Sequence, residues 1–212
     1  MSSDSGPAKV LLVVDVQNDF CPGGSLAVPD GDRIVGVINR LMESFDAVVA
    51  TQDWHPEDHV SFASSHAGAK PFDAIEVDCR EQVLWPDHCV IGSRGAELHP
   101  DLDTDPLRAV FRKGSSPALD SYSAFFENDR RTPTGVEGYL KDLGLTSVYL
   151  VGLATDVCVY YSAMDAVRRG FDVWLVEDAC RGIDSPPGSL AGRLEEMGAA
   201  GVRMVRSGDL GP

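Results

Sequence analysis

Short runs of β-branched residues alternate with segments of helical periodicity along most of this chain, and this alternation constrains its fold more than any other feature. The strand-like runs are residues 9–14, 47–50, 107–111, 147–153, 172–176 and 202–205. The helical segments are residues 34–42, with Asp32 as a cap near the start, and residues 135–143, 156–169 and 190–197. Alternating strands and helices predict an α/β fold, a three-layer doubly wound sheet of about six mainly parallel strands with helices on both faces.

The length of the chain and one long irregular connection bear on its organisation. With 212 residues, the chain is expected to form a single domain over 1–212, because one core can grow to about 250 residues before it splits. Residues 1–7 are expected to be a flexible N-terminus. Residues 53–106 are rich in Pro, Gly, His and Asp and have no clear helical period. Irregular stretches of that length are usually functional.

Charge and cysteine content restrict the partners and the compartment. The net charge of −15, from 18 basic and 33 acidic residues, excludes nucleic acid and anionic lipid surfaces as partners. A small neutral substrate would be little affected by this negative charge. The apolar runs are too short to cross a bilayer, and no secretory signal is recognised at the start. Five widely spaced cysteines without a C-x-x-C pair indicate reduced thiols, so a cytoplasmic protein is expected.

Three reactive side chains follow apolar strands. Asp15, Lys113 and Cys158 each come at or just after the end of a predicted strand. The carboxyl ends of parallel strands meet at one edge of a sheet, so an acid, a base and a thiol are expected to converge there as an activated nucleophile. Taken singly, each has a plainer interpretation: a turn residue, a solvated charge and a packed thiol.

Cys158 also lies where a helix is expected to begin. Unpaired N–H groups and the helix dipole at that point would stabilise a thiolate. The same N–H groups could hold the oxyanion of a tetrahedral intermediate.

The irregular connection contains a second group of side chains. Asp53 and His55 stand two residues apart, on one face of an extended chain, and His88 follows in the same connection. One carboxylate and two imidazoles suit Zn²⁺, Fe²⁺ or Mn²⁺ and leave positions open for water or substrate. His59 lies close by. Hydrogen-bonded loop histidines are the alternative explanation.

Five segments together resemble the signature of the nicotinamidases, which belong to the isochorismatase-like hydrolase superfamily. They are Asp-Val-Gln-Asn-Asp-Phe at 15–20, Thr-Gln-Asp-Trp-His-Pro at 51–56, Trp-Pro-Asp-His-Cys at 85–89, Arg-Lys-Gly at 112–114 and Gly-Leu-Ala-Thr-Asp-Val-Cys at 152–158. The segments follow the order of the family. The aspartate, lysine and cysteine are typical of the cysteine hydrolases in the superfamily, and the histidine segments indicate its metal-containing nicotinamidase branch.

The resemblance implies a role for each residue. It implies that Asp15 is the general base and then acid, that Cys158 is the nucleophile and that Lys113 supports their charge state. It further implies a metal held by Asp53, His55 and His88, with His59 as a fourth candidate. The remaining implied site residues are Phe20, Trp85, Tyr122 and Leu153 around the substrate, and the backbone N–H groups of Ala154 and Cys158 as the oxyanion hole. A cis peptide between Leu153 and Ala154 is also expected.

The implied function is hydrolysis of nicotinamide to nicotinate and ammonia through a Cys158 thioester, within pyridine nucleotide (NAD) salvage. One divalent ion per chain would orient the pyridine ring, with zinc first and iron or manganese as alternatives. Pyrazinamide as a second substrate and a homo-oligomer stay open. Three other functions stay open as well: a related amidohydrolase of N-carbamoyl, ureido or maleamate-type substrates, a hydrolase with a metal-activated water, and a binding module without catalysis.

Overall fold

The centre of the computed structural model, which describes residues 8–211, is a six-stranded sheet in the order β5-β2-β1-β6-β7-β8. Its strands are β1 Lys9–Val14, β2 Ala47–Asp53, β5 Leu107–Lys113, β6 Ser147–Leu153, β7 Asp172–Arg181 and β8 Arg203–Val205. All neighbouring strands pair in parallel. The predicted α/β class and the six-stranded sheet are confirmed. The flexible N-terminus predicted for residues 1–7 lies outside the described residues.

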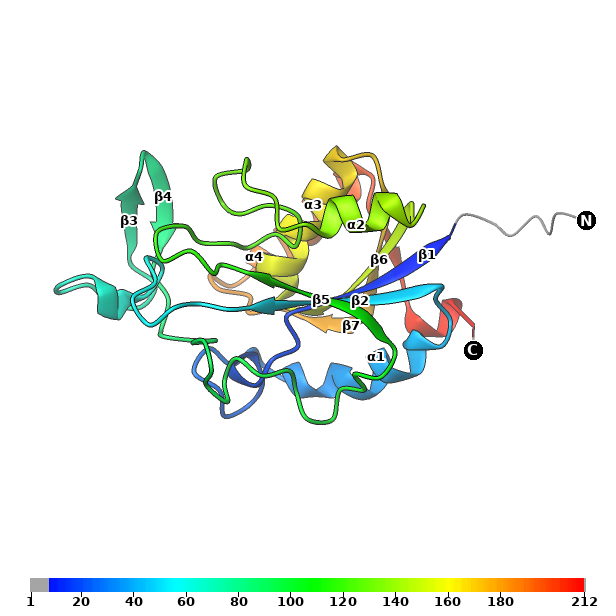
Figure 1. Ribbon diagram of the computed structural model, residues 1–212, viewed down its shortest axis with the longest axis horizontal. Helices are drawn as coiled ribbons and strands as arrows, with labels where there is room; N and C mark the ends of the chain where they lie inside the picture. The colour runs from blue at the N-terminus through cyan, green and yellow to red at the C-terminus, as the bar shows by residue number, and fades with distance from the viewer. Residues whose placement is uncertain (1–7, 212) are drawn as a thin grey trace, which may run out of the picture.

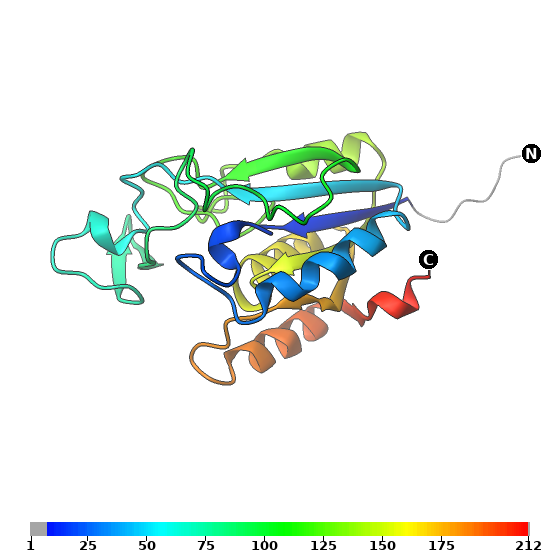
Figure 2. The same cartoon turned by 90° about the horizontal axis from the view of Figure 1, so that it is seen from below.

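Helices cover both faces of the sheet, as predicted. Helix α1 (Val35–Met42) lies on one face, whereas α2 (Val136–Asp142), α3 (Tyr160–Arg168) and α4 (Ser189–Ala200) lie on the other (Figures 1 and 2). The prediction of Asp32 as a cap is wrong, because a 3₁₀ turn, Gly31–Ile34, leads into α1 and the helix start has no side-chain cap. Among residues 8–211, no helix combines the length and the apolar character that a membrane span requires.

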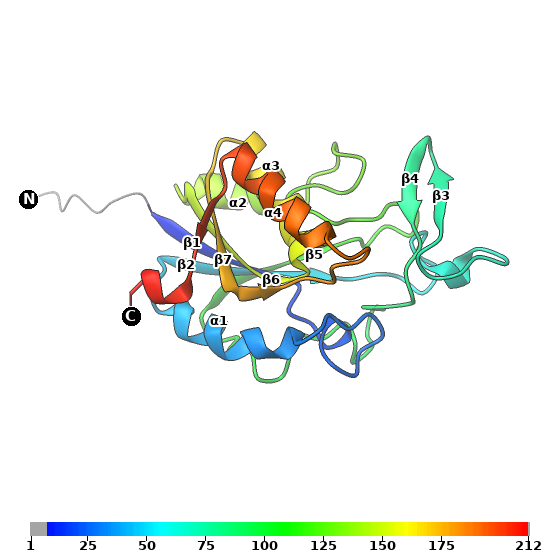
Figure 3. The same ribbon diagram turned by 180° about the vertical axis from the view of Figure 1, so that it is seen from behind.

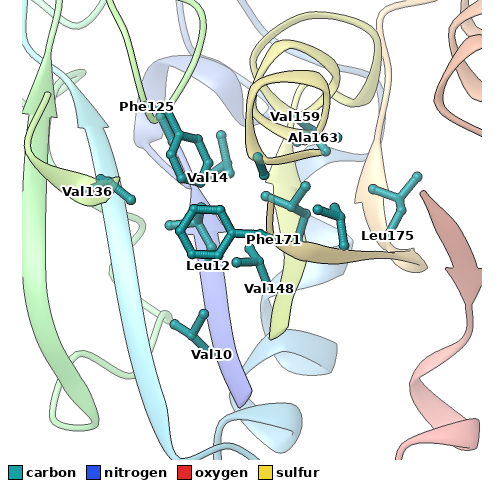
Figure 4. Close-up of a cluster of buried hydrophobic side chains, with 14 of the residues drawn as sticks. Val10, Leu12, Val14, Phe125, Val136, Val148, Val159, Ala163, Phe171 and Leu175 are labelled. Carbon is teal, nitrogen blue, oxygen red and sulfur yellow. The ribbon is translucent and has the colours of Figure 1, made fainter. Parts of the chain in front are cut away.

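Strand β1 is buried on both faces, and its alternate side chains enter two separate cores. Val10, Leu12 and Val14 pack with Phe125 under the three-helix layer (Figure 4). Leu11 and Val13 pack with side chains of α1 on the opposite face. A strand covered on both sides needs apolar residues at every position, which explains the continuous apolar run in the sequence.

The order of the strands reverses beside β1. The chain proceeds outward from β1 to β2 and β5, and then returns to the other side of β1 to build β6, β7 and β8. At this point Gly152 has φ +118°, and an added Cβ would come 2.0 Å from the Val14 carbonyl oxygen. The close approach of the two strand ends therefore requires glycine. Such a reversal forms a crevice outside the carboxyl ends of the strands, where ligands bind in sheets of this kind.

The long connection 53–106 is less irregular than the sequence predicts. It contains a hairpin, β3 (Ala74–Val77) and β4 (Arg80–Val83), which projects from the end of the molecule at which the β2 and β5 strands finish (Figures 1 and 3). Each strand has only four residues, and most of them are exposed or half-buried. With so little apolar alternation, the hairpin gives almost no periodic signal.

Several element boundaries also differ from the prediction. Strands β2, β5 and β7 extend beyond their predicted ends. The segment predicted as one helix over 156–169 begins instead with a π-helical turn, Thr155–Val159, before the regular helix α3.

Candidate active site

Four neighbouring strands deliver four reactive side chains to one buried cluster. Lys113 is the last residue of β5, Asp53 is the last residue of β2, and the two are directly paired in register. Asp15 follows β1, and Cys158 follows β6 within the π-helical turn. The spatial order of the side chains thus repeats the order of the strands, and the predicted convergence of Asp15, Lys113 and Cys158 is present.

Lys113 is fully buried and connects the other three side chains. Its Nζ lies 2.9 Å from Asp15 Oδ2, 2.5 Å from Asp53 Oδ1 and 3.6 Å from Cys158 Sγ. It also donates to the Ser121 carbonyl oxygen at 2.9 Å. Burial alone would lower the pKa of this amine, but Asp15 and Asp53 outweigh burial and raise the pKa well above its usual value. The ammonium group therefore stays charged.

Asp15 combines one fixed and one free carboxylate oxygen. Its backbone is left-handed, with φ 49°. Oδ1 accepts a hydrogen bond from Thr51 Oγ1 at 2.6 Å. Oδ2 is close to Lys113 Nζ but outside hydrogen-bond geometry, and it has no hydrogen-bond partner in the part of the chain that the structure describes. Burial raises the pKa of Asp15, although Lys113 opposes this effect. This oxygen is free to take a proton.

The surroundings of the Cys158 thiol favour its protonated form. Burial raises its pKa well above the usual value, with Lys113 opposing and Asp15 and Asp53 adding to the rise. The stabilisation of a thiolate by the helix start stays a prediction, and burial and the two carboxylates oppose it. Asp15, Asp53 and Cys158 bring their reactive atoms within 4.8 Å of one another. The carboxylate of Asp15 is therefore close enough to take the thiol proton.

The backbone before Cys158 provides donors for an oxyanion. The Leu153–Ala154 peptide bond is cis, as expected. Ala154 directly follows β6 and precedes the π-helical turn that contains Cys158. The Ala154 and Cys158 N–H groups stay the predicted oxyanion hole.

The three predicted metal ligands lie together beside Lys113. The candidate ligand atoms of Asp53, His55 and His88 are within 4.8 Å of one another. The Nε2 atoms of the two histidines lie 3.6 Å and 3.9 Å from Asp53 Oδ2. Their Nδ1 atoms are each 2.8 Å from a backbone carbonyl oxygen, those of Gly114 and Pro86.

This pattern of hydrogen bonds fits a metal site. Carbonyl oxygens at Nδ1 fix the proton there and leave Nε2 as the electron-pair donor on each ring. Burial would raise the pKa of Asp53, but Lys113, His55 and His88 outweigh it and lower the pKa. Burial and the neighbouring His55 lower the pKa of His88. An ionised carboxylate and a neutral imidazole are the states that bind a divalent ion.

His59 is placed differently from the three ligands. Its ring stacks on His55 at a centroid distance of 4.1 Å. Its Nδ1 lies 2.7 Å from Ser61 Oγ, and its Nε2 lies 3.2 Å from the Leu119 carbonyl oxygen. Burial and His55 lower its pKa to about 4. A second group, His55, His59 and Asp120, is also compact, but both ring nitrogens of His59 already have protein partners. We therefore interpret His59 as a support for His55.

A narrow pocket opens between Cys158 on one side and Asp53 and His88 on the other. Its lining includes three of the predicted substrate-binding residues, Phe20, Trp85 and Tyr122. Trp85 Nε1 donates to Tyr122 Oη at 3.2 Å, which fixes the two rings relative to each other. The fourth predicted residue, Leu153, is not in the lining, because its side chain is fully buried in the core on the α1 face.

The sequence did not identify the other residues of the pocket wall. These are Leu26, Val28, Asp120 and Ile183, together with Val157, which lies in the recognised segment 152–158 but was not predicted to line the pocket. Ordinary apolar side chains in loops match no motif, so only the folded chain reveals them. Asp120, which accepts from Gln82 Nε2 at 2.7 Å, lies outside the five recognised segments.

Comparison with protein families gives one match, to the isochorismatase domain, over residues 9–203. Among curated proteins, the chain is 52% identical to a nicotinamidase of Acinetobacter baylyi, covering 93% of this chain and 92% of the relative. It is 46% identical to a nicotinamidase of Escherichia coli, covering 96% of this chain and 97% of the relative.

Solved structures show the same likeness in three dimensions. A nicotinamidase/pyrazinamidase of Acinetobacter baumanii superposes with a TM-score of 0.94 at 50% identity, over 97% of this chain and 99% of that one. A protein from L. infantum in complex with nicotinate has a TM-score of 0.83 at 40% identity, over 95% and 94%. A pyrazinamidase of Pyrococcus horikoshii in complex with zinc has a TM-score of 0.77 at 36% identity, over 94% and 99%.

Proposed function

The chain belongs to the isochorismatase-domain family, within its nicotinamidase branch, and from this premise we propose that it hydrolyses nicotinamide to nicotinate and ammonia through a thioester on Cys158. The observation that carries the proposal is the position of Lys113. One buried ammonium group contacts the proposed base Asp15, the proposed metal ligand Asp53 and the nucleophile sulfur. Lys113 thus connects the residues proposed for acyl transfer with a residue proposed to hold the metal that orients the substrate.

The first half of the reaction forms the thioester. Cys158 Sγ attacks the carboxamide carbon while Asp15 Oδ2 takes the thiol proton. Burial raises the pKa of both groups, so Asp15 is a stronger base for a thiol that is itself harder to deprotonate. The Ala154 and Cys158 N–H groups receive the developing oxyanion. When the C–N bond breaks, Asp15 returns the proton to the nitrogen, and ammonia leaves.

The second half of the reaction consumes water. Asp15, again ionised, removes a proton from water as the water oxygen attacks the thioester carbon. The C–S bond breaks, Sγ regains a proton and nicotinate is released. Lys113 keeps its charge throughout and limits the repulsion between Asp15, Asp53 and the transient thiolate.

Asp53, His55 and His88 are the residues that would hold a divalent ion, and the bound ion would supply an electrophilic centre for the pyridine nitrogen. The zinc complex of the Pyrococcus horikoshii relative supports zinc as the ion. Phe20, Trp85 and Tyr122 then enclose the ring and exclude water from it. We further propose that the whole chain acts as a single catalytic domain, because both halves of one sheet build this pocket.

The wall of the pocket argues against the rival amidohydrolases. An N-carbamoyl amino acid or a maleamate carries a carboxylate, which requires a cationic partner. Among the described residues that line the pocket, there is no Arg or Lys. A neutral aromatic carboxamide fits the lining better.

Trapping the intermediate tests the proposal. Nicotinamide should yield nicotinate and ammonia in equal amounts, and rapid acid quenching should reveal a nicotinoyl group on Cys158 by peptide mass spectrometry. Cys158→Ala should lose turnover and the adduct together. Cys180→Ala is the matched control, because that thiol is buried in the core and burial raises its pKa to about 12. Normal turnover by Cys158→Ala would exclude the thioester and favour a water nucleophile.

A further inference from the structure

The loop after β7 forms one wall of the pocket and is attached to the nucleophile turn. Ile183 lines the pocket beside Ala154, Val157 and Cys158. Ile183 comes two residues after the end of β7, where the loop has left the sheet. The position of its side chain therefore depends on contacts outside the sheet.

Asp156 supplies those contacts. It belongs to the same π-helical turn as Cys158 and is 7% exposed. Its Oδ1 accepts a hydrogen bond from the Ile183 N–H at 2.9 Å, and its Oδ2 accepts from the Asp184 N–H at 2.8 Å. Two backbone N–H groups, one on each oxygen of a single carboxyl group, form a directional clamp. The clamp fixes the backbone at Ile183 relative to the nucleophile.

The neighbouring residues extend the clamp to helix α4. An added Cβ on Gly182 would lie 3.1 Å from Asp156 Oδ1 and 2.8 Å from Leu190 Cδ1, so the loop passes close to both residues. Asp184 is itself left-handed, with φ 52°. Its Oδ1 accepts from the N–H groups of Gly188 and Leu190, at 2.8 Å and 3.1 Å. Two carboxylates in series thus connect the nucleophile turn, the loop and the start of α4.

We propose that Asp156 is a positioning residue for substrate selection, and that Ile183, held by it, is the side chain that restricts substituents on the substrate ring. This inference rests on the proposed nicotinamidase function. Ile183 shares the pocket with Leu26 and Val28, which like it offer no side-chain hydrogen-bond donor or acceptor. Aliphatic side chains of this kind discriminate between substrates by steric exclusion, so they accept an unsubstituted ring edge and exclude a larger one. Because the clamp joins the wall to Cys158, a displaced wall changes which rings can reach the sulfur.

The test compares nicotinamide with its four ring-methylated isomers, at the 2-, 4-, 5- and 6-positions. Ile183→Ala should raise kcat/KM for at least one isomer relative to nicotinamide by about tenfold or more, because one methyl group in an apolar pocket is worth roughly 10–200-fold. Asp156→Asn should relax selection for the same isomer, because its amide group can accept only one of the two N–H groups. Backbone amide exchange at Ile183 and Asp184 should accelerate in Asp156→Asn.

Asp178→Asn is the matched control. Asp178 lies in β7 and likewise accepts two hydrogen bonds, from the N–H and the Oγ of Ser207, away from the pocket. It should leave the order of the isomers unchanged. If Asp156→Asn does not fold, Asp184→Asn loosens the loop from the α4 side and should relax the same selection to a smaller degree.

The outcomes separate this inference from the proposed function. A wild-type protein that does not hydrolyse nicotinamide refutes the function. A wild-type protein that does so, together with folded Asp156→Asn or Asp184→Asn variants that rank the isomers as the wild type does, refutes the positioning role alone. Selection that is unchanged in Ile183→Ala refutes the role of that side chain.

Discussion

At the scale of single residues, Lys113 is the group on which the site depends. It is a fully buried cation between two buried carboxylates. The desolvation of three charges is tolerated only because each has a partner. Removal of the ammonium group would leave Asp15 and Asp53 next to each other without compensation.

We therefore expect Lys113→Met to lose turnover and also about 3–5 kcal/mol of unfolding free energy, the usual cost of breaking a buried ion pair. Denaturant unfolding measures the loss. Lys141→Met is the matched control: this lysine pairs with Glu137 on the surface at 2.7 Å, a contact worth less than about 1 kcal/mol. The loss at Lys113 should shrink in an Asp15→Asn background, where one carboxylate is already neutral. Equal losses in the two lysine variants would contradict the buried-pair account.

The orientation of His55 depends on another single residue, Gly114. Its φ is +62°, and an added Cβ would lie 2.3 Å from His55 Cε1, so the imidazole occupies the space that a side chain would need. The Gly114 carbonyl oxygen also holds His55 Nδ1. The backbone of this residue thus sets the orientation of a proposed metal ligand.

Gly114→Ala should consequently reduce the amount of zinc, iron or manganese that purifies with the protein, as measured by elemental analysis. Gly138→Ala serves as its control, because Gly138 lies in α2 with open space around its Cα. That change should stabilise the fold by roughly 0.5–1 kcal/mol and leave the metal content unchanged. Wild-type metal content in Gly114→Ala would show that His55 does not need this orientation.

The sequence predicted the reactive side chains and the aromatic residues of the pocket, but not its aliphatic wall. Asp15, Lys113 and Cys158 follow strands, and parallel strands place their ends together by geometry. Leu26, Val28 and Ile183 reach the pocket from two loops far apart in the chain. Their side chains are ordinary apolar ones, and no local pattern encodes the tertiary contacts that bring them there.

At the scale of elements, the largest differences from the sequence prediction lie where local periodicity is weak or altered. The β3–β4 hairpin has four-residue strands with polar faces. The π-helical turn Thr155–Val159 widens the start of what the sequence presents as one helix. An apolar pattern cannot distinguish a π-helical turn from an α-helical one over five residues.

Helices α2 and α3 are linked by a titratable contact whose effect on stability can be predicted. Arg169, the residue that follows α3, donates from Nε to both carboxylate oxygens of Glu137 in α2, at 2.9 Å each. Burial alone would raise the pKa of Glu137, but Lys141 and Arg169 outweigh it and lower the pKa below its usual 4.5. A carboxyl group whose pKa is lower in the folded than in the unfolded state stabilises the fold at pH values above its unfolded-state pKa. This contribution disappears as the pH falls through the folded-state pKa.

Glu137→Gln should therefore lower the Tm at neutral pH, by an amount that corresponds to roughly 0.5–1 kcal/mol for a partly exposed pair. The difference from wild type should shrink as the pH falls through the folded-state pKa of Glu137, because the wild-type carboxyl group then also becomes neutral. Thermal unfolding at neutral and acid pH measures it. An undiminished difference at acid pH would mean that Glu137 acts through packing rather than charge.

At the scale of the whole molecule, the doubly wound topology explains why one pocket can contain two kinds of chemistry. The proposed metal ligand Asp53 ends β2 and the proposed nucleophile Cys158 follows β6, on opposite sides of β1. The sequence predicted the sheet because each of its strands contains an apolar run. The strand order required the structure, since periodicity within a strand does not specify its neighbours.

This separation makes the pocket selective for the distance between two groups on a substrate. A ring nitrogen must reach the side of Asp53 and His88 while the carboxamide carbon reaches Cys158 Sγ. Nicotinamide meets both demands, and pyrazinamide keeps a nitrogen at the same ring position. Benzamide has the same amide and nearly the same shape but lacks the nitrogen donor.

We expect kcat/KM for benzamide to fall well below the values for nicotinamide and pyrazinamide when all three are measured on protein of identical metal content. Removal of the metal by chelation should reduce the rate with nicotinamide far more than the rate with benzamide, because only the first substrate uses the proposed metal site. His55→Ala should likewise reduce the difference in kcat/KM between nicotinamide and benzamide. The variant removes a proposed metal ligand but leaves Cys158, Asp15 and Lys113 in place. Benzamide hydrolysed as fast as nicotinamide by metal-loaded protein would show that Asp53, His55 and His88 do not select the ring, and their cluster would then stabilise the loop rather than read the substrate.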